Sequence, residues 1–600
     1  MTAWPKFLLV LIAFALWTEL ASIAFVYASG LYPVFPYPTF QWWEYLPYAG
    51  SVPTVRMWLG LSAILAALPA VPVASWWRRR RRLTTSPFGW VRPSQRGVTD
   101  NHGHARWKSM TEARRDFPGP HPVYGGVVVG EAYRVDRDWR ARLFQFNPRR
   151  RWTWGKGGTA PLLIDPCTDG PTHSLLFAGS GGFKTTSAIA TILTWRGASI
   201  VMDPSCEVGP MLAAALERQG KRVVMLSPTR PDGVTNWGIN VLDWIDVDDP
   251  MAIQHVRTVV GWIWRESDSP KEMENRFFED WGKDLAACLL ASLLWDAPPG
   301  VPKTLETLRE AIAIPETAMK QQLHAIANTS RCGMVRHIAG QLSDMAAPET
   351  FTGIHASCSR ATSWLSNKAY AQLVSGDAMR TQDLRRGNIT AFVQIPLQAL
   401  MNNPAIARVL IGALMNSVYQ ADGRLRGRVL FLLDEAARLG KMSIIETARD
   451  AGRKYGITLQ LLYQSVAQLE AQWGKEGKRA WYEGVSWRGY AALNDLDTAE
   501  EVSKWCGGRG VIAFSEGGNF GRSTPFAFVK GGNASSSLGR NTNLHEIAKP
   551  LIRPEELVQD PRTDEIFVVG RGKPMRAGRA IYFRRPELAA MVDQSRFLTS

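Results

Sequence analysis

The chain has 600 residues, more than one hydrophobic core usually serves, so its length excludes a single small domain and predicts at least two folded units. Its composition, with 46% hydrophobic and 21% charged residues, is ordinary for a globular protein. The six cysteines contain no C-x-x-C pair, which fits reduced thiols and excludes a disulfide framework or a zinc motif. The net charge of +16 suits a polyanionic partner or an anionic membrane surface, although five of these charges are the arginines at 78–82.

Two apolar stretches near the N-terminus predict helices that span a membrane. The first runs from about residue 7 to residue 28, and at a rise of 1.5 Å per residue it can cross the hydrocarbon core of a bilayer. A cleaved signal peptide is the alternative for this stretch, but the apolar run is too long for one. The second stretch, residues 57–77, contains no charge, and the arginines after it keep the rest of the chain in the cytoplasm. Residues 1–90 are therefore predicted to form a two-helix transmembrane anchor with a periplasmic hairpin.

A glycine-rich loop lies between an apolar strand pattern, Ser174–Ala178, and a helix pattern that ends near Trp195. This order places backbone N–H groups and a helix N-terminus around phosphates, with Lys184 directed to the terminal phosphates and Thr185 available to Mg²⁺. Phe183 departs from the usual pattern, because its Cβ disfavours a positive φ. A glycine-rich turn with an incidental lysine is therefore the alternative for the loop taken alone. The predicted nucleotide-binding residues are Gly179, Ser180, Gly181, Gly182, Phe183, Lys184, Thr185 and Thr186.

An apolar strand pattern that ends in two acids supplies the second half of a nucleotide site. Val429–Leu433 consists of five apolar residues, as expected of a central parallel strand that is covered on both faces. Asp434, which follows, is predicted to hold Mg²⁺ together with Thr185, and Glu435 is predicted to polarise the attacking water as general base. The pair of acids alone would be a common pattern, and it is the combination with the glycine-rich loop that predicts an ATPase.

Two further polar residues are candidates for catalysis. Gln464 follows the strand pattern Ile457–Tyr463, at the edge where open α/β sheets bind ligands, and is predicted to sense the γ-phosphate or its water. Arg453 is predicted to reach the nucleotide of a neighbouring subunit, with a solvated surface cation as the alternative. The sequence therefore predicts a P-loop NTPase that uses ATP and Mg²⁺, with Lys184, Glu435, Gln464 and Arg453 as its catalytic residues.

The order of these motifs resembles the coupling-protein ATPases of type IV secretion systems, the TraG-like family of conjugative DNA transfer. The resemblance runs nearly end to end and rests on the two N-terminal spans, the glycine-rich loop and the segments Gly103–Trp107, Asp203–Glu207, Asp434–Glu435, Gly452–Gly456, Gln464 and Lys549–Glu556. Ser205 and Cys206 stand where many members carry Lys and Gly, and the loop with Phe183 looks like a variant of the family's P-loop.

The resemblance implies a fold class, a set of partners and a place in the cell. The fold is expected to be α/β, with a RecA-like P-loop nucleotide-binding domain, a helical insertion domain and the two-helix anchor. A homohexameric ring in the bacterial inner membrane is expected, with its ATPase body in the cytoplasm. The expected partners are single-stranded DNA that carries a relaxase, and the proteins of the secretion channel. The expected domains are the anchor at 1–90, the ATPase domain at 91–254 and 376–600, and the insertion at 255–375.

Three smaller predictions concern other parts of the chain. Apolar residues at helical spacing between the strand patterns support the helical insertion. Strand patterns at Ile566–Val569 and Ala580–Phe583 are expected to close the nucleotide-binding domain. The segment Gly517–Asn541 is rich in Gly, Ser and Asn and is expected to be a mobile loop.

These observations favour one function and leave two alternatives open. The first hypothesis is an inner-membrane coupling ATPase that recruits a relaxase-DNA complex and drives its transfer into a type IV secretion channel during conjugation. One alternative keeps the motor but restricts the cargo to protein effectors. The other is a membrane scaffold whose P-loop is catalytically silent because of Phe183.

Overall fold

The computed structural model divides the chain into two compact units. One unit, called here the N-terminal unit, comprises residues 1–98 and 511–547, and the other, the sheet unit, comprises residues 99–510 and 548–600. Ser180 of the predicted loop and the arginines at 78–82 lie outside the described residues. The structure describes residues 4–30, 39–68, 84–86, 89–91, 95–97, 99, 101–179, 181–229, 237–265, 276–523, 535–559, 562–570 and 572–593.

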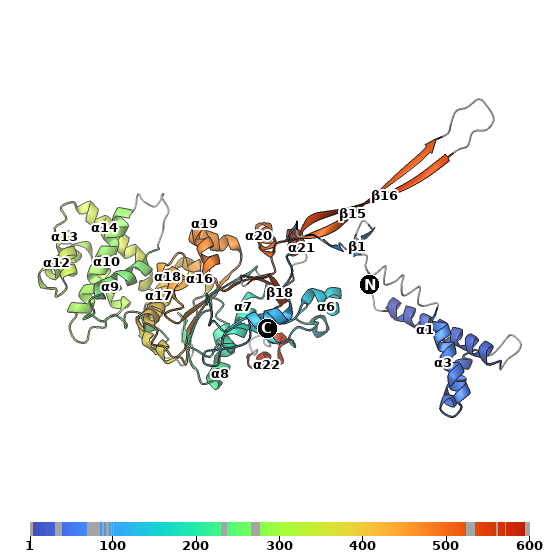
Figure 1. The fold of residues 1–600 in the computed structure, drawn as a ribbon. Coiled ribbons are helices and arrows are strands. Elements are labelled where there is room, and N and C mark those ends of the chain that lie inside the picture. The colour runs from blue at the N-terminus through green and yellow to red at the C-terminus, as the bar shows by residue number, and fades with distance from the viewer. Residues whose placement is uncertain are drawn as a thin grey trace. The chain divides into compact units, whose positions relative to one another are not determined.

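The N-terminal unit contains a helical hairpin, drawn in dark blue in Figure 1. Trp42 connects its two long helices, because the backbone N–H of Trp42 donates to Ser22 Oγ at 3.1 Å and its indole N–H donates to the Leu59 carbonyl at 3.1 Å. Phe25 and Leu59 are buried in the small apolar cluster that forms between the helices. The helices are α1 (Trp4–Ser29), α2 (Gln41–Tyr45), the 3-10 helix η1 (Leu46–Gly50) and α3 (Pro53–Ala67).

The two spans predicted at 7–28 and 57–77 fall on this hairpin. The first lies within α1, whereas the second begins in α3 and continues into residues 69–77, which the structure does not describe. Within the described ranges, no helix combines the length and the apolar character needed to cross a membrane. The transmembrane anchor stays a prediction.

Two long strands occupy the segment that was expected to be a mobile loop. β15 (Gly508–Ser523) and β16 (Ser535–Pro550) are neighbours in one small sheet, in which β3 (Gln95–Arg96) pairs antiparallel with β15. Figure 1 shows β15 and β16 side by side over most of their length. The loop expected at Gly517–Asn541 is thus wrong for its described parts. A backbone ladder needs no apolar side chains, so composition underestimates such strands.

A large mixed sheet forms the centre of the sheet unit. From β14 to β8 every neighbouring pair is parallel, whereas the strands on the other side of β14 pair antiparallel. The eleven strands, in spatial order, are β5 (Leu162–Asp165), β4 (Val127–Glu131), β18 (Met575–Gly578), β17 (Glu565–Val569), β14 (Trp487–Ala491), β6 (Ser174–Ala178), β13 (Ile457–Tyr463), β12 (Val429–Leu433), β7 (Ser199–Met202), β11 (Ile389–Val393) and β8 (Arg222–Leu226).

Helices cover both faces of this sheet, which explains why its central strands are continuous apolar runs. In β12, Leu430 and Leu432 belong to the core beneath one face, whereas Phe431 and Leu433 belong to the core beneath the other. All four side chains are at most 1% exposed. The first core includes α7 (Lys184–Thr194) and α8 (Val208–Arg218), and the second includes α17 (Ala405–Gln420), α18 (Ser443–Ala451), α19 (Val466–Gly484) and α20 (Leu496–Cys506).

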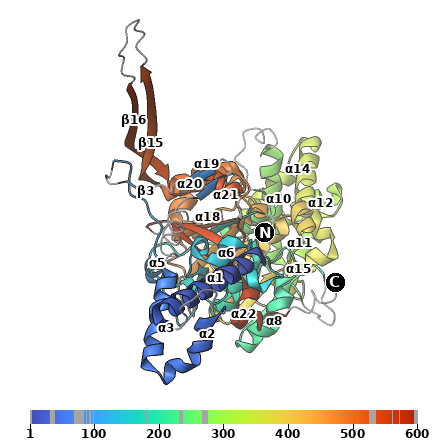
Figure 2. The same ribbon diagram turned by 90° about the vertical axis from the view of Figure 1, so that its right-hand side faces the viewer.

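A body of helices extends from the second core. It is drawn in green to yellow, and Figures 1 and 2 show α10, α12 and α14 gathered at one side of the sheet unit. The helical insertion was predicted at 255–375, and the boundaries of the predicted domains stay predictions. The helices are α9 (Ala252–Ile263), α10 (Arg276–Asp296), α11 (Leu305–Ile312), α12 (Glu316–Thr329), α13 (Gly333–Ser343), α14 (Pro348–Ala361) and α15 (Lys368–Ser375).

The C-terminal part of the sheet differs from its prediction. Ile566–Val569 lies in β17 as expected, but Ala580–Phe583 is an irregular segment that enters the 3-10 helix η8 (Tyr582–Arg584). Its buried side chains pack against the helical layer instead of extending a strand, and the strand that pairs with β17 is β18.

The remaining elements are β1 (Thr84–Ser86), β2 (Gly89–Val91), α5 (Met110–Asp116), η2 (Val135–Arg137), α6 (Trp139–Leu143), η3 (Arg151–Thr153), β9 (Ile239–Asn240), η5 (Ser363–Ser366), β10 (Gly376–Asp377), η6 (Thr381–Arg386), α16 (Leu397–Asn402), η7 (Ala436–Leu439), α21 (Pro554–Gln559) and α22 (Pro586–Ala589).

Candidate functional site

Three adjacent parallel strands present the predicted site residues at one edge of the sheet. β13 lies between β6 and β12, and all three run in the same direction. The glycine-rich loop follows β6, the two acids follow β12, and Gln464 follows β13. These residues therefore meet at the carboxyl edge of the strands, where open α/β sheets bind their ligands.

Lys184 faces both acids across this edge. Its Nζ lies 2.5 Å from Glu435 Oε1 and 3.1 Å from Asp434 Oδ1. The three side chains are only 10–14% exposed. The structure thus brings together Lys184 and Glu435, which are 251 positions apart in the chain, as the sequence predicted.

Thr185 and Gln464 complete the cluster. Thr185 Oγ1 donates to Asp434 Oδ2 at 2.7 Å, so the hydroxyl and the carboxylate predicted to hold Mg²⁺ are already in contact. Gln464 Nε2 donates to Glu435 Oε1 at 3.0 Å. The other carboxylate oxygen of Glu435, Oε2, is buried and has no hydrogen-bond partner among the described residues.

Opposing influences set the protonation of Glu435. Burial raises the pKa of its carboxyl group, but the hydrogen bond and the charge of Lys184, the hydrogen bond from Gln464 and the charge of Arg438 together outweigh burial. The pKa of Glu435 is therefore below its ordinary value, and the carboxylate is charged at neutral pH. A charged carboxylate with one unpartnered oxygen can accept a proton.

Phe183 adopts a positive φ, which its Cβ was expected to disfavour. Its φ is 53° and its ψ is 33°, in the left-handed region, which costs a residue with a Cβ roughly 1–2 kcal/mol. The ring lies 5.9 Å from the ring of Phe146 and 5.9 Å from the ring of Phe583, edge to face in both cases. Each such pair contributes about 0.5–1.5 kcal/mol. The two aromatic contacts are thus large enough to offset the backbone strain.

Three glycines and Thr186 are the other predicted nucleotide-binding residues that the structure describes. Gly179 and Gly182 lie against Ala492, and a Cβ at Gly182 would come within 2.8 Å of the Gly179 carbonyl oxygen. Gly181 has a φ of 70°, which favours glycine. Thr186 lies in the first turn of α7 and is partly buried.

Arg453 is not part of this cluster. It precedes β13, at the amino edge of the sheet, where it is exposed and donates from Nη2 to the Thr168 carbonyl at 3.3 Å. A role at the nucleotide of a neighbouring subunit requires a second chain and stays a prediction.

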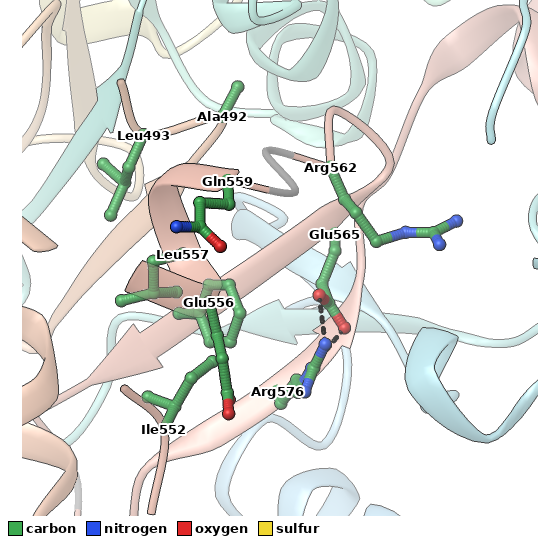
Figure 3. Close-up of a pocket in the computed structure, with 10 residues that line it drawn as sticks. Ala492, Leu493, Ile552, Glu556, Leu557, Gln559, Arg562, Glu565 and Arg576 are labelled. Atoms are coloured by element: carbon green, nitrogen blue, oxygen red, sulfur yellow. Dashed lines mark hydrogen bonds and ion pairs between the residues drawn. The ribbon is translucent and has the colours of Figure 1, made fainter. Parts of the chain in front are cut away.

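Two features near the loop escaped the sequence analysis. One is Arg579, a buried residue after β18 that contacts the loop and stands in no recognisable motif. The other is a cavity of about 330 Å³ beside Ala492, whose Glu565 and Arg576 form a two-bond ion pair (Figure 3). Its two acids and two arginines balance in charge, so the cavity has no evident preference for a phosphate. Its lining residues are Ala492, Leu493, Ile552, Glu556, Leu557, Gln559, Arg562, Glu565, Phe567 and Arg576.

The residues at the carboxyl edge fit a nucleoside triphosphate with Mg²⁺. A glycine-rich loop at the N-terminus of an eleven-residue helix supplies backbone N–H groups, and Lys184 supplies a positive charge. Mg²⁺ prefers oxygen ligands and usually takes only one or two from the protein, which Thr185 and Asp434 provide. Within the described residues no group of three or more His, Cys, Asp or Glu side chains could hold a metal alone, so phosphate oxygens and water would complete the set.

Comparisons with known proteins give the same family for most of the chain. The family model described as "Type IV secretory system Conjugative DNA transfer" matches residues 107–600. The chain is 39% identical over 499 residues to a conjugal transfer protein TraG of Rhizobium radiobacter, covering 83% of this chain and 74% of that protein. It is 38% identical over 524 residues to a type IV secretion system-coupling protein VirD4 of Bartonella quintana, covering 86% of this chain and 78% of that protein.

The fold is also similar to that of a solved structure. The bacterial conjugative coupling protein TrwBdeltaN70, in its trigonal form with sulphate, superposes with a TM-score of 0.51 at 14% identity. The match covers 77% of this chain and 95% of that one. At this identity the likeness concerns the fold alone.

Proposed function

The chain belongs to the type IV secretory system conjugative DNA transfer family, and we propose that it is an ATP-driven coupling protein that moves DNA towards a secretion channel. The observation that carries the motor is the meeting of Lys184 with Asp434 and Glu435 at the carboxyl edge of the sheet. A relative named as a conjugal transfer protein and a relative named as a type IV secretion system-coupling protein support the cargo and the channel.

The proposed chemistry assigns one task to each side chain of the cluster. The loop backbone and Lys184 bind the phosphates, and Thr185 and Asp434 hold Mg²⁺. Bound Mg²⁺ would neutralise charge on the phosphate oxygens. Glu435 accepts a proton from the attacking water, for which its charged state and its unpartnered Oε2 are suited. Gln464, hydrogen-bonded to Glu435, orients that carboxylate and the water.

The proposal extends to the assembly and its surroundings. Two N-terminal apolar stretches and the arginines at 78–82 support an anchor in the bacterial inner membrane with the sheet unit in the cytoplasm. Family membership supports a homohexamer that takes up single-stranded DNA carrying a relaxase. In such a ring Arg453 of one subunit would approach the nucleotide of the next.

ATP hydrolysis by the purified full-length protein tests the proposal. We expect turnover that requires Mg²⁺ and rises severalfold when single-stranded DNA is added at low salt, because a polyanion binds a basic protein most strongly there. Turnover that DNA does not change, at any salt concentration, would favour the alternative in which the cargo is protein only.

The silent scaffold is tested by transfer itself. Lys184→Ala removes the charge that binds the phosphates, so a working motor loses transfer of a conjugative plasmid, whereas a scaffold keeps it. Membrane fractionation of the variant is the control, because loss of transfer is informative only when the protein is present at its normal level and place. Normal transfer by Lys184→Ala would refute the motor.

A further inference from the structure

A buried arginine lies behind the glycine-rich loop. Arg579 follows β18 and is 1% exposed. Its Nη1 donates to the carbonyl of Gly182, within the loop, and to the carbonyl of Thr563 at 3.4 Å. Its Nε donates to Ser187 Oγ, in the first turns of α7, at 2.6 Å. The side chain is thus held by two carbonyls and a hydroxyl.

Among the described residues, no carboxylate balances the charge of Arg579. Its Nη2 is buried and finds no partner there. Burial lowers the pKa of the guanidinium to about 9, and no acid in the described part of the chain raises it again. Asp564 is paired instead with Arg562 at 3.2 Å. A buried charge without a counter-ion is unfavourable, so the loop region is stabilised when an anion binds nearby.

Arg579 acts on the peptide that carries one of the loop's N–H groups. The carbonyl of Gly182 and the N–H of Phe183 belong to the same peptide, and in a trans peptide they point in opposite directions. With its carbonyl held by Arg579, this peptide turns the N–H of Phe183 to the other side of the loop. A hydrogen bond to the carbonyl also polarises the peptide and strengthens the N–H as a donor.

Ser187 extends the same contact to the strained residue. Its Oγ accepts from Arg579 and lies 3.3 Å from the carbonyl of Phe183, to which it donates. The carbonyls on either side of the Phe183 Cα are therefore both connected to Arg579. The left-handed conformation of Phe183 is fixed from both sides.

We infer that Arg579 is a positioning residue of the phosphate loop, which holds the Gly182–Phe183 peptide with its N–H towards the bound phosphates and adds an unbalanced positive charge that favours the more highly charged nucleotide. The inference rests on the proposed nucleotide site at this loop. It also gives the β17–β18 pair a part in nucleotide binding, because Arg579 directly follows β18 and reaches the rear of the loop.

Nucleotide affinities of the full-length protein test the inference. In Arg579→Gln the side chain keeps a donor but loses the charge. We expect the affinity for ATP to fall about tenfold, since charge-assisted hydrogen bonds are roughly twice as strong as neutral ones. The affinity for ADP should fall less, because ADP is the less highly charged nucleotide. The preference for ATP over ADP therefore decreases. Arg579→Lys, which keeps the charge, is expected to restore part of that preference.

Arg428→Gln is the matched control. Arg428 is also an arginine bound to hydroxyls and carbonyls, donating to Thr458 Oγ1 at 2.9 Å and to the Ile457 carbonyl at 2.7 Å, but it precedes β12 at the opposite edge of the sheet. Its replacement is expected to lower the melting temperature without changing the ATP-to-ADP preference. An Arg579→Gln protein that melts lower but keeps the wild-type preference would reduce Arg579 to a structural clamp and overturn the inference.

A second variant decides the question if Arg579→Gln does not fold. Ser187→Ala removes the hydroxyl between Arg579 and Phe183, and a decrease of about threefold in ATP affinity is expected, because the bond from Arg579 and the bond to the Phe183 carbonyl are both lost while the charge of Arg579 stays. Unchanged affinity in this variant would also overturn the inference. If the wild-type protein binds neither ATP nor ADP, the proposed function fails before Arg579 is in question.

Discussion

Largely buried lysines lie at both edges of the central sheet, but their partners differ. At the carboxyl edge Lys184 is paired with two carboxylates, Asp434 and Glu435. At the amino edge Lys221, which precedes β8, donates to the Gly197 carbonyl at 3.0 Å and to Thr390 Oγ1 at 3.3 Å. The charge of Lys184 is thus balanced by opposite charges, whereas Lys221 contacts only neutral oxygen atoms among the described residues.

This difference separates an edge at which a ligand can replace a side-chain partner from an edge whose contacts hold the sheet together. Charged partners can be exchanged, because a phosphate can take the place of a carboxylate beside Lys184 at little electrostatic cost. The carbonyl that Lys221 contacts belongs to the backbone next to β7 and cannot move without disturbing the sheet. The same residue type therefore has opposite consequences at the two edges, and substitutions there should affect turnover at one edge and stability at the other.

Glu435→Gln is expected to have the largest effect. The variant keeps the shape of the carboxyl edge but removes the proposed base, and general bases contribute roughly 10²- to 10⁴-fold to turnover. The rate of ATP hydrolysis should fall by at least about 10²-fold while ATP still binds. Steady-state turnover and nucleotide binding, measured on the same preparation, check both parts.

A carboxylate on the surface provides the control for this variant. Glu476 lies on α19 with its side chain 84% exposed, beside Arg479. Glu476→Gln should leave turnover unchanged. Hydrolysis at the normal rate by Glu435→Gln would show that the carboxyl edge does not work as proposed.

Lys221 is expected to make stability depend on pH. Burial lowers the pKa of its amine to about 7 in the folded protein, whereas the unfolded chain has the ordinary value for lysine. Between about pH 7 and pH 10 the unfolded state thus binds the additional proton, so stability rises with pH by up to about 1.4 kcal/mol per unit from this group. Lys221→Met should remove that rise, with no change in turnover relative to wild type.

Melting temperatures of the two proteins across this pH range measure the effect. The difference between them isolates Lys221, because other titrating groups are common to both proteins. Parallel curves would mean that the amine is not desolvated, and a loss of turnover in Lys221→Met would mean that the amino edge is not merely structural.

Gln464→Ala is expected to have a moderate effect at the carboxyl edge. It removes the 3.0 Å hydrogen bond to Glu435, which is worth about 1 kcal/mol at an exposed position and therefore about fivefold in turnover. Gln464→Glu should be more severe, because it places a second negative charge beside the charged Glu435. Equal turnover in the two variants would exclude Gln464 as a partner of Glu435.

The carboxyl edge could be predicted from the sequence because its residues follow apolar strand patterns directly. Asp434 and Gln464 come immediately after strands that continuous apolar runs identify, Lys184 follows within a few residues, and parallel strands end at one edge. The resemblance to the family added the order of the motifs. Both the mostly parallel sheet and the cluster at its edge could therefore be predicted.

Arg579 could not be predicted in the same way. It follows β18, a strand that pattern analysis missed, and the apolar run Ala580–Phe583 beyond it was interpreted as the strand instead. Its contact with Gly182 depends on packing between segments that are 397 residues apart. Likewise, the rings that compensate the strain of Phe183 come from Phe146 and Phe583, which no local pattern connects to the loop.

Phe183 variants are expected to have the smallest effect and test how the loop tolerates its left-handed residue. Phe183→Gly loses the two ring contacts but also loses the strain, because glycine has no Cβ. Phe183→Ala loses the contacts and keeps the strain. The two variants therefore differ mainly in the backbone strain of about 1 kcal/mol. Part of this strain is imposed only when ATP fixes the conformation of the loop, and that part lowers ATP affinity roughly threefold. In a titration with ATP, affinity should decrease from wild type to Phe183→Gly to Phe183→Ala.

This order reverses the usual effect of the two smaller residues, which is what makes it diagnostic. In ordinary helical backbone Ala is more favourable than Gly, because Gly loses more conformational freedom on folding. Gly340, on α13, provides the matched control, since a Cβ added there meets nothing within 4 Å and its φ is not positive. Gly340→Ala should leave ATP affinity unchanged and stabilise the protein slightly. If Phe183→Ala binds ATP as tightly as Phe183→Gly, the left-handed backbone at the carboxyl edge carries no strain, and the aromatic contacts serve another purpose.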